Sequence, residues 1–226
     1  MKEMEYEGLQ RSPELYIDRM GRLTNSRLSD AIRKTSKGNY YAARDTYMAQ
    51  LIAERISNKP MPSYTSWAMQ WGIDNEKLAS DSYTALTGNP VVAVGFVKHP
   101  TIKWYGGSPD GLVGDDGSIE IKCPETAKHL NTILTGEVDE EYLDQMMGNM
   151  IVTGRKWCDF VSFDPRIEGE MSIFVKRIGY DVVRAKEIER EAVIFINEMI
   201  DKIDRMLVNY PRTREEYFKH WHSQYQ

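Results

Sequence analysis

The sequence predicts an α/β fold in which a central mixed five-stranded sheet is flanked by helices. Apolar residues recur at helical spacing near both ends of the chain, whereas residues 91–122 hold short β-branched runs separated by glycines. Two further strand patterns follow after a pair of helical segments, so strands and helices alternate within one unit. We expect a single domain over 1–226, with a helical N-terminal part (1–90), a core (91–180) and C-terminal helices (181–226), although two small domains would also fit this length.

The first helix has a strong start signal. Ser12 suits the N-cap, and Pro13 suits the first helical position, where its missing N–H costs nothing. Gly21 is expected to end this helix. The next helix would be capped by one of three consecutive residues, Thr24, Asn25 or Ser26.

The remaining elements follow in order from the period of the apolar residues and from the glycines that close them. The expected helices and strands are helices at 40–56 and 63–88, strands within 91–97, 102–107, 110–114 and 118–122, helices at 124–136 and 139–154, strands at 156–163 and 171–178, and helices at 181–209 and 211–221.

Composition excludes several classes of protein. With only two cysteines, Cys123 and Cys158, a disulfide framework, a four-cysteine zinc site and a cysteine-ligated iron–sulfur cluster are not expected. No apolar run approaches the ~20 residues that span a bilayer, and the N-terminus lacks the apolar segment of a signal peptide, so we expect a cytoplasmic protein. The net charge of −5 argues against a surface that is basic all over, but it permits a local basic groove.

The segment SPDGLVGDDGSIEIKCP, residues 108–124, predicts a hairpin that ends in charged residues. If Asp115, Asp116 and Gly117 form a three-residue loop, Leu112 pairs with Glu120 and Asp110 pairs with Lys122. Side chains alternate across a strand, so this register puts three charged residues on one face and three apolar residues on the other. The charged face would hold Asp110, Glu120 and Lys122, and the core-facing side Val113, Ile119 and Ile121.

A face with this chemistry is suited to phosphodiester hydrolysis. Two carboxylates a few ångströms apart repel by about 4 kcal/mol at an effective dielectric of 20, so they favour a cation between them. Oxygen-only ligands prefer Mg²⁺ or Mn²⁺, which can hold a phosphate and activate a water, while Lys122 orients that water or stabilises the developing charge. The alternative is that Asp110 and Asp115 are turn residues and that Glu120 and Lys122 form an exposed pair on an edge strand.

The segment resembles the signature of the PD-(D/E)xK nucleases, and within them the lambda-type viral recombinase exonucleases. That family has SPDG, a hairpin and a Glu-x-Lys-Cys-Pro strand end. The segments RMGRLTNSRLSD, WGIDNEKLA, YLDQMMGNMIVTG and FDPR are also similar to family motifs and occur in the same order, so the resemblance covers about residues 10 to 180. It implies a restriction-endonuclease-like core.

The resemblance also implies roles for individual residues. Asp110 and Glu120 would be metal ligands, together with the main-chain carbonyl of Ile121 and the helical Glu76, and would hold one or, more consistently with the family, two Mg²⁺ ions that Mn²⁺ could replace. Lys122 would act on the nucleophilic water, and Gln145 would place the water or the scissile phosphate. The expected pocket for the 5′-terminal phosphate consists of Arg19, Thr24, Ser26 and Ser108, with Arg22 and Arg27 near enough to share the role of Arg19. Met69 falls where the family places a strand-separating wedge.

The function implied is a Mg²⁺-dependent, processive 5′→3′ exonuclease. It would degrade one strand of linear double-stranded DNA with a 5′-phosphate to mononucleotides and leave a 3′ overhang for recombination. The family further implies a ring-shaped homotrimer and a single-strand annealing protein as partner. Two alternatives stay open: a structure-specific or restriction-type endonuclease with the same metal site, and a non-catalytic protein that binds DNA ends.

Overall fold

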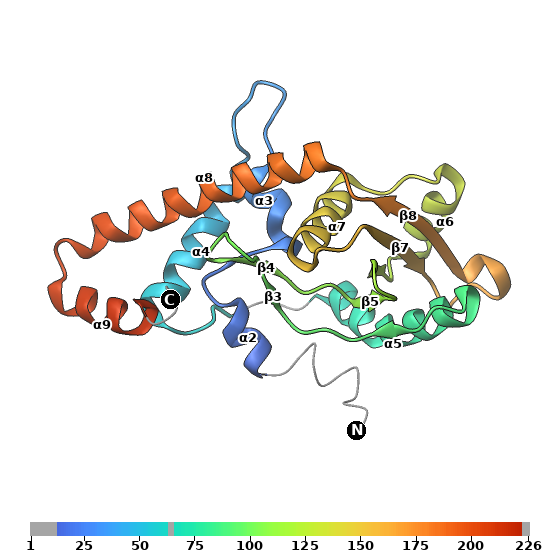
Figure 1. Cartoon of the computed structure of the whole chain (residues 1–226). Coiled ribbons are helices and arrows are strands. Elements are labelled where there is room, and N and C mark those ends of the chain that lie inside the picture. Colours follow the sequence, from blue (N-terminus) through green and yellow to red (C-terminus); the bar gives the residue numbers. More distant parts are fainter. Residues whose placement is uncertain (1–12, 63–65, 223–226) are drawn as a thin grey trace.

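The computed structural model describes residues 13–62 and 66–222, and the elements within these ranges form two halves (Figure 1). One half holds the main sheet, and the other is helical and extends away from it along α8. The helices are α2 (Pro13–Arg19), η1 (Asn25–Arg27), α3 (Leu28–Ile32), α4 (Ala43–Ser57), α5 (Trp67–Thr87), α6 (Thr126–Thr135), α7 (Glu140–Thr153), η2 (Gly169–Ser172), α8 (Val182–Leu207) and α9 (Pro211–His222). The strands are β1 (Leu23–Thr24), β2 (Val91–Val92), β3 (Val97–Lys98), β4 (Tyr105–Gly107), β5 (Gly111–Val113), β6 (Gly117–Lys122), β7 (Trp157–Phe163) and β8 (Ile173–Gly179).

The mixed five-stranded sheet is confirmed. Its strand order is β2-β5-β6-β7-β8, with β6 and β7 parallel and the other neighbours antiparallel. The parallel pair is joined by the helices α6 and α7, as a crossover between parallel strands requires. This sheet carries the segment with the charged residues.

A second, three-stranded sheet was not predicted. Its order is β1-β4-β3, and it contains strands of two or three residues. The apolar run 91–97 is therefore not one strand: β2 joins the main sheet, and β3 joins the small one. Strands this short carry too few residues to show a period of two.

The two faces of the main sheet are covered by different helices. In Figure 1, α5 lies below the strands and α7 lies above them. Ile119, Ile121 and Val161 face α5 and pack with its Ala79 and Tyr83. Residues of the opposite face, such as Cys158 and Phe160, pack instead with the buried α7 methionines, Met146, Met147 and Met150.

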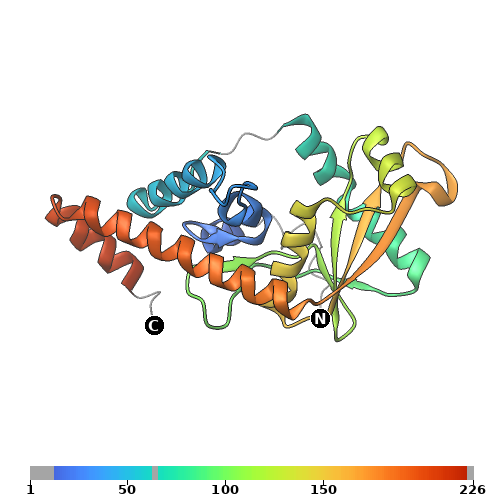
Figure 2. The ribbon, with the colours of Figure 1, turned by 90° about the horizontal axis from the view of Figure 1, so that it is seen from above.

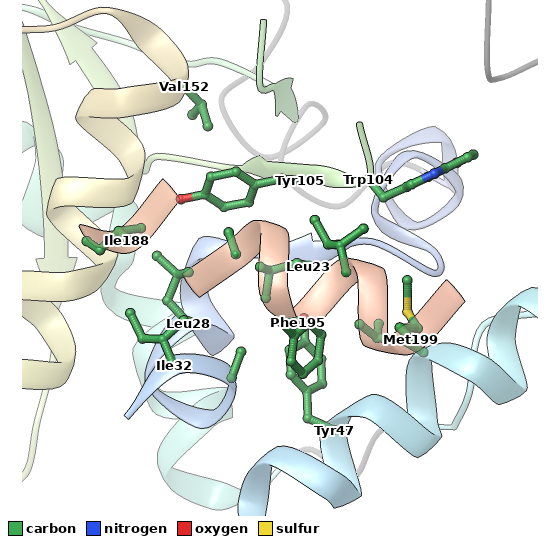
Figure 3. Close-up of a cluster of buried hydrophobic side chains, with 14 of the residues drawn as sticks. Leu23, Leu28, Ile32, Tyr47, Trp104, Tyr105, Val152, Ile188, Phe195 and Met199 are labelled. Carbon is green, nitrogen blue, oxygen red and sulfur yellow. The ribbon is translucent and has the colours of Figure 1, made fainter. Parts of the chain in front are cut away.

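The core of the helical half is built around α8. Every buried apolar residue of α8 lies on one stripe, and Figure 3 shows Phe195 and Met199 of this helix beside Leu23, Leu28 and Tyr47. Figure 2 shows α8 and α9 side by side at the end of the molecule away from the sheet. Because β1 and α3 pack into this core, both ends of η1, the short segment between them, are fixed in position.

The α2–β1 turn is fixed by two charged side chains of α4. The N–H of Gly21 donates to Glu54 Oε2 at 2.8 Å, and Arg55 Nε donates to the Gly21 carbonyl at 2.8 Å. A Cβ at position 21 would lie 2.6 Å from Arg55 Cγ, so only glycine allows this approach. The turn sets the positions of Arg19 before it and Thr24 after it.

The hairpin register differs from the prediction by two residues. Leu112 pairs with Ser118 rather than Glu120, and the three-residue loop is Gly114 to Asp116, with Gly114 at φ 53°. Gly117 is not in the loop because it lies in β6 beneath the Trp157 indole, where a Cβ would meet ring atoms at 2.2 Å. A shift of two preserves the alternation of faces, so the predicted grouping of side chains is unaffected.

The caps predicted for the first two helices fall on Ser12 and on the segment 24–26. Ser12 lies outside the described residues, although α2 does begin at Pro13. Thr24 precedes η1, but its side chain makes no capping hydrogen bond, and Arg27 occupies the N-cap position of α3. The hydroxyls predicted as caps are therefore available for other contacts.

The described helices include none that is both long and apolar enough to cross a bilayer.

Candidate active site

Asp110, Glu120 and Lys122 meet at the end of β6, as the shared face predicted. Lys122 Nζ donates to Glu120 Oε1 at 2.5 Å, and the Ile121 N–H donates to Asp110 Oδ2 at 2.6 Å. Glu120 is fully buried, whereas Lys122 keeps about a quarter of its side chain exposed. The site is thus a carboxylate pair, with Glu120 fully buried and Asp110 half-buried, and one ammonium group that reaches solvent.

Burial shapes the protonation of this group. Burial, followed by the charge of Asp110, raises the pKa of Glu120 to about 8, although Lys122 opposes this. Burial likewise raises the pKa of Asp110, against the charge of Lys122 and the Ile121 hydrogen bond. Burial would lower the pKa of Lys122, but the charges of Glu120 and Asp110 outweigh it and raise that pKa. Two buried carboxylates that disfavour ionisation together are a place where added positive charge is favourable.

Helix α7 contributes two amide side chains to the cluster. Gln145 Oε1 accepts a hydrogen bond from Lys122 Nζ at 3.3 Å. Asn149 Nδ2 donates to Glu120 Oε2 at 3.0 Å. The two residues are four apart and therefore share one face of the helix. Gln145 was predicted for this site and Asn149 was not; the Gln-x-x-x-Asn spacing was the signal that could have identified it.

A cleft of about 600 Å³ opens beside the cluster, between the start of α5 and the end of β6. Its walls include Glu76, Ile121 and Lys122, and Met69 stands at its α5 side with 55% of its surface exposed. Glu76 contributes to the raised pKa of Glu120, so its carboxylate lies within electrostatic range of the pair. Of the predicted metal-site and wedge residues, Glu76, Ile121 and Met69 line this cleft, whereas Asp110 and Glu120 are not among its lining residues.

The tryptophans of α5 contribute to the wall of this cleft. Trp67 and Trp71 stack on each other with ring centroids 5.7 Å apart, and the Arg166 guanidinium lies 4.4 Å from the Trp71 ring centroid. Arg166 also donates to the Pro124 carbonyl at 3.0 Å. The FDPR segment thus joins the start of α5 to the chain that follows β6.

The predicted anion-binding residues form a second cluster on the α2–η1 segment. Arg19 donates to Ser26 Oγ at 3.0 Å, and the hydroxyls of Ser26 and Thr24 lie 3.4 Å apart. Thr24 also contacts the Tyr47 hydroxyl at 3.3 Å. Burial lowers the pKa of Arg19, and the charge of Asp110 acts against that shift, so this cluster lies near the carboxylate pair.

Ser108 and the two neighbouring arginines differ in their availability. The Ser108 hydroxyl is buried and makes no hydrogen bond within the described residues. Arg27 forms an ion pair with Asp30 and lies over the Tyr47 ring. Arg22 is buried with its guanidinium 4.9 Å from the Trp104 ring centroid. Arg19 is thus the arginine that contacts the Ser26 hydroxyl.

The donor set fits a hard divalent cation. The available atoms are carboxylate oxygens of Asp110 and Glu120 and the adjacent main chain of Ile121, all of which are ligands that Mg²⁺ and Mn²⁺ prefer. Within residues 13–62 and 66–222, no three histidine, cysteine or acidic side chains are grouped as a complete metal site. The protein side chains thus supply a partial, open set, in which a cation would need further oxygen ligands.

The histidines and cysteines play other parts in the described structure. His129 bridges Ser162 Oγ and the Met171 carbonyl at 2.8 Å each, and His99 contacts Glu189 at 3.1 Å. Cys123 is a free, buried cysteine and serves as a small core side chain. Burial raises its pKa to about 12, so its thiol does not ionise near neutral pH.

The fold is shared with solved exonucleases. An alkaline exonuclease from Laribacter hongkongensis superposes with a TM-score of 0.83 at 41% identity, over 89% of this chain and 99% of that chain. The same values hold for that enzyme in complex with dAMP. A phage-related exonuclease from Haemophilus somnus 129PT has a TM-score of 0.59 at 16% identity, over 80% of this chain and 96% of that one, and shows a shared fold.

The sequence assigns the family. Residues 16–156 match the family described as the YqaJ-like viral recombinase domain. This chain belongs to the YqaJ-like viral recombinase domain family, which confirms the resemblance to the lambda-type viral recombinase exonucleases. Among curated proteins, none matches the sequence.

Proposed function

We propose that this protein is a Mg²⁺-dependent 5′→3′ exonuclease that degrades one strand of linear double-stranded DNA. The observation that carries the proposal is the Asp110–Glu120 pair with Lys122, which lines an open cleft, near the Arg19–Ser26 cluster. Membership of the family and 41% identity to an alkaline exonuclease support the nuclease class. That relative has been crystallised with dAMP, a mononucleotide of the kind this reaction would release.

In this proposal, the site would hold two divalent cations, either Mg²⁺ or Mn²⁺. Their ligands would be Asp110, Glu120, the Ile121 carbonyl and Glu76. A bound cation would supply charge stabilisation at the phosphate and lower the pKa of a water. Lys122 keeps its proton because the two carboxylates raise its pKa, so it stabilises the negative charge that develops on the phosphate oxygens. Gln145 holds the Lys122 ammonium in place and orients the attacking water.

The polarity of the reaction would be set at the second cluster. Arg19, Thr24, Ser26 and Ser108 would offer a guanidinium and three hydroxyls to the 5′-terminal phosphate, and the buried Ser108 hydroxyl makes no hydrogen bond within the described residues that this would replace. Met69 would separate the two strands at the duplex end. Attack of water on the next phosphorus breaks its bond to the 3′ oxygen and releases a 5′-mononucleotide, so a 3′ single-stranded overhang remains.

The biological setting follows from the same proposal. A ring-shaped homotrimer would enclose the DNA and make digestion processive, and a single-strand annealing protein would receive the overhang. Both would operate in the cytoplasm.

A duplex with only one 5′-phosphorylated end tests the proposal directly. With Mg²⁺, we expect strand loss from the phosphorylated end and no cutting of circular DNA, and Lys122→Ala should lower the rate by at least ~100-fold, the low end for a group that stabilises charge in the transition state. Lys156→Ala is the matched control, because Lys156 is an exposed partner of Asp116 on the hairpin. Cutting of the circle would favour an endonuclease, and no Mg²⁺-dependent loss of either DNA would leave only a DNA-binding protein.

A further inference from the structure

Two buried asparagines link the anion cluster to the carboxylate pair. Asn25 Nδ2 donates to Asn149 Oδ1 at 2.8 Å, and Asn149 Nδ2 donates to Glu120 Oε2 at 3.0 Å. Asn25 is 1% exposed, and Asn149 and Glu120 are fully buried. The chain Asn25–Asn149–Glu120, here called the amide relay, therefore runs through the interior without contact with water.

The surrounding backbone is shaped to admit the relay. A Cβ at Gly107 would lie 1.9 Å from Asn25 Nδ2 and 2.7 Å from Asn149 Oδ1. A Cβ at Gly148 would lie 2.4 Å from Asn25 Oδ1. Any side chain at either glycine would displace the asparagines. The strand β4 and the helix α7 thus leave a space that these two side chains fill.

The direction of each hydrogen bond in the relay is determined. An ionised Glu120, as a bound cation would keep it, only accepts, so Asn149 must present its NH₂ group to Glu120 and its oxygen to Asn25. Asn25 must then present its own NH₂ group to Asn149. If the NH₂ group and the oxygen of either amide were exchanged, two acceptors or two donors would oppose each other across a buried contact. Such a contact costs about 1–3 kcal/mol. The orientation of Asn25 therefore fixes that of Asn149, and through it the rotamer of Glu120.

Asn25 lies between the two hydroxyl residues of the anion cluster. Thr24 and Ser26 flank it on the same single turn, Ser26 is exposed, and Arg19 holds Ser26 at 3.0 Å. A phosphate bound by Ser26 and Thr24 would fix this turn, and the side chain of Asn25 would be fixed with it.

We propose that Asn25 and Asn149 are positioning residues that make the placement of Glu120 depend on occupancy of the 5′-phosphate cluster. This inference rests on the proposed function. It adds a reason why cleavage would be faster at a phosphorylated end. The bound 5′-phosphate would help to position Glu120, the carboxylate that holds the cation. Neither asparagine touches the substrate.

The test compares kcat and KM on duplexes with a 5′-phosphate or a 5′-hydroxyl end. Asn149→Asp keeps the shape and the bond from Asn25 but cannot donate to Glu120, and Asn25→Asp cannot donate to Asn149. We expect both to lower kcat on the phosphorylated end by about 10–100-fold, the usual effect of losing a partner of a metal ligand, with KM little changed. The ratio of kcat for the two ends should fall toward one. Ser26→Ala should instead raise KM for the phosphorylated end.

The control variant is Tyr83→Phe. It removes another buried hydrogen bond to a carboxylate, the 2.7 Å contact with Asp159, on the opposite face of the same sheet. It should lower the melting temperature without changing the kcat ratio. If Asn149→Asp fails to fold, Asn25→Asp and Asn149→Leu decide the question.

A binding measurement without turnover completes the test. With Ca²⁺ as the added cation, fluorescence anisotropy on wild-type protein should show that Ca²⁺ strengthens binding of the phosphorylated duplex more than that of the hydroxyl duplex, because coupling is reciprocal. Both asparagine variants should lose this difference. An unchanged kcat ratio and Ca²⁺ effect in both would overturn the relay. A wild-type protein that cuts no DNA would instead overturn the proposed function.

Discussion

At the scale of single residues, the fully buried Glu120 has the most demanding environment in the site. It lies beside a second carboxylate and is held by Lys122 and Asn149. The Lys122 ammonium and the neutral Asn149 amide do not fully offset the two adjacent carboxylates, as the raised pKa of Glu120 indicates. The electrostatics of the site therefore favour a divalent cation beside Asp110 and Glu120.

A prediction about Glu120 follows from this imbalance. Mg²⁺ or Mn²⁺ should raise the melting temperature of the wild-type protein relative to EDTA, and at a hundred times its Kd a cation adds about 2.7 kcal/mol to the free energy of unfolding. Glu120→Gln should abolish most of the shift because it removes one ionic ligand. Differential scanning calorimetry measures both, with Glu140→Gln as the control at an exposed α7 carboxylate. An equal shift in Glu120→Gln would place the cation elsewhere.

At the scale of elements, the segment after β7 connects the walls of the cleft. Asp164 is fully buried and accepts from Thr126 Oγ1 at 2.6 Å and from Arg166 Nε at 2.7 Å. Burial would raise the pKa of Asp164, but the hydrogen bonds from Arg166 and Thr126 outweigh it and hold that pKa at about 2. Asp164 thereby positions Arg166 over Trp71 and ties α6 to the end of β7.

The depressed pKa of Asp164 predicts a pH dependence. The ionised carboxylate is favoured in the folded state, so its contribution to stability is present above the ordinary pKa of 3.8 and is lost as the pH falls toward 2. Asp164→Asn should lower the free energy of unfolding at neutral pH by about 2 kcal/mol, since hydrogen bonds to charged groups contribute this much.

Urea unfolding of the variant between pH 4 and pH 2 provides the measurement. The stability of Asp164→Asn should depend less on pH over this interval than that of the wild-type protein. Asp116→Asn is the control, because Asp116 pairs with Lys156 at an exposed position. Equal pH dependence of wild type and Asp164→Asn would show that the Arg166 contact does not stabilise the fold.

At the scale of the whole molecule, α8 presents two different faces. Its buried stripe packs on the helical half, while several large apolar residues remain exposed along or just after it. These exposed residues are Val182, Val183, Val193, Ile194, Met206, Val208 and Tyr210. Such side chains, exposed along the length of α8, are suited to contact with another subunit.

The proposed ring predicts the mass in solution. Light scattering coupled to gel filtration should give three times the chain mass of 26.2 kDa, unchanged on tenfold dilution. A monomer would contradict the ring and the processivity derived from it. It would leave the chemistry at Asp110, Glu120 and Lys122 intact, because all three come from one chain.

The main helices, the positions of the longer strands along the chain and the charged face of the hairpin could be predicted from the sequence alone. Period and capping are local, so α5, α7 and α8 begin and end close to where the pattern placed them. The grouping of Asp110, Glu120 and Lys122 was predictable because alternation of faces depends only on parity. The same parity made the two-residue error in register harmless.

The contacts of Asp110, Glu120 and Lys122 with segments distant in the sequence could be known only from the tertiary structure. The register depended on Trp157, which is 40 positions from Gly117 in the chain and excludes a side chain there. The β1–β4 pairing, the contact of Arg166 with Trp71 and the Asn25–Asn149 hydrogen bond join segments separated by between 82 and 124 residues, and no local pattern encodes such pairs. Asn25 and Asn149 are ordinary in the sequence, and they gain their chemistry from the fully buried Glu120 that packing places beside them.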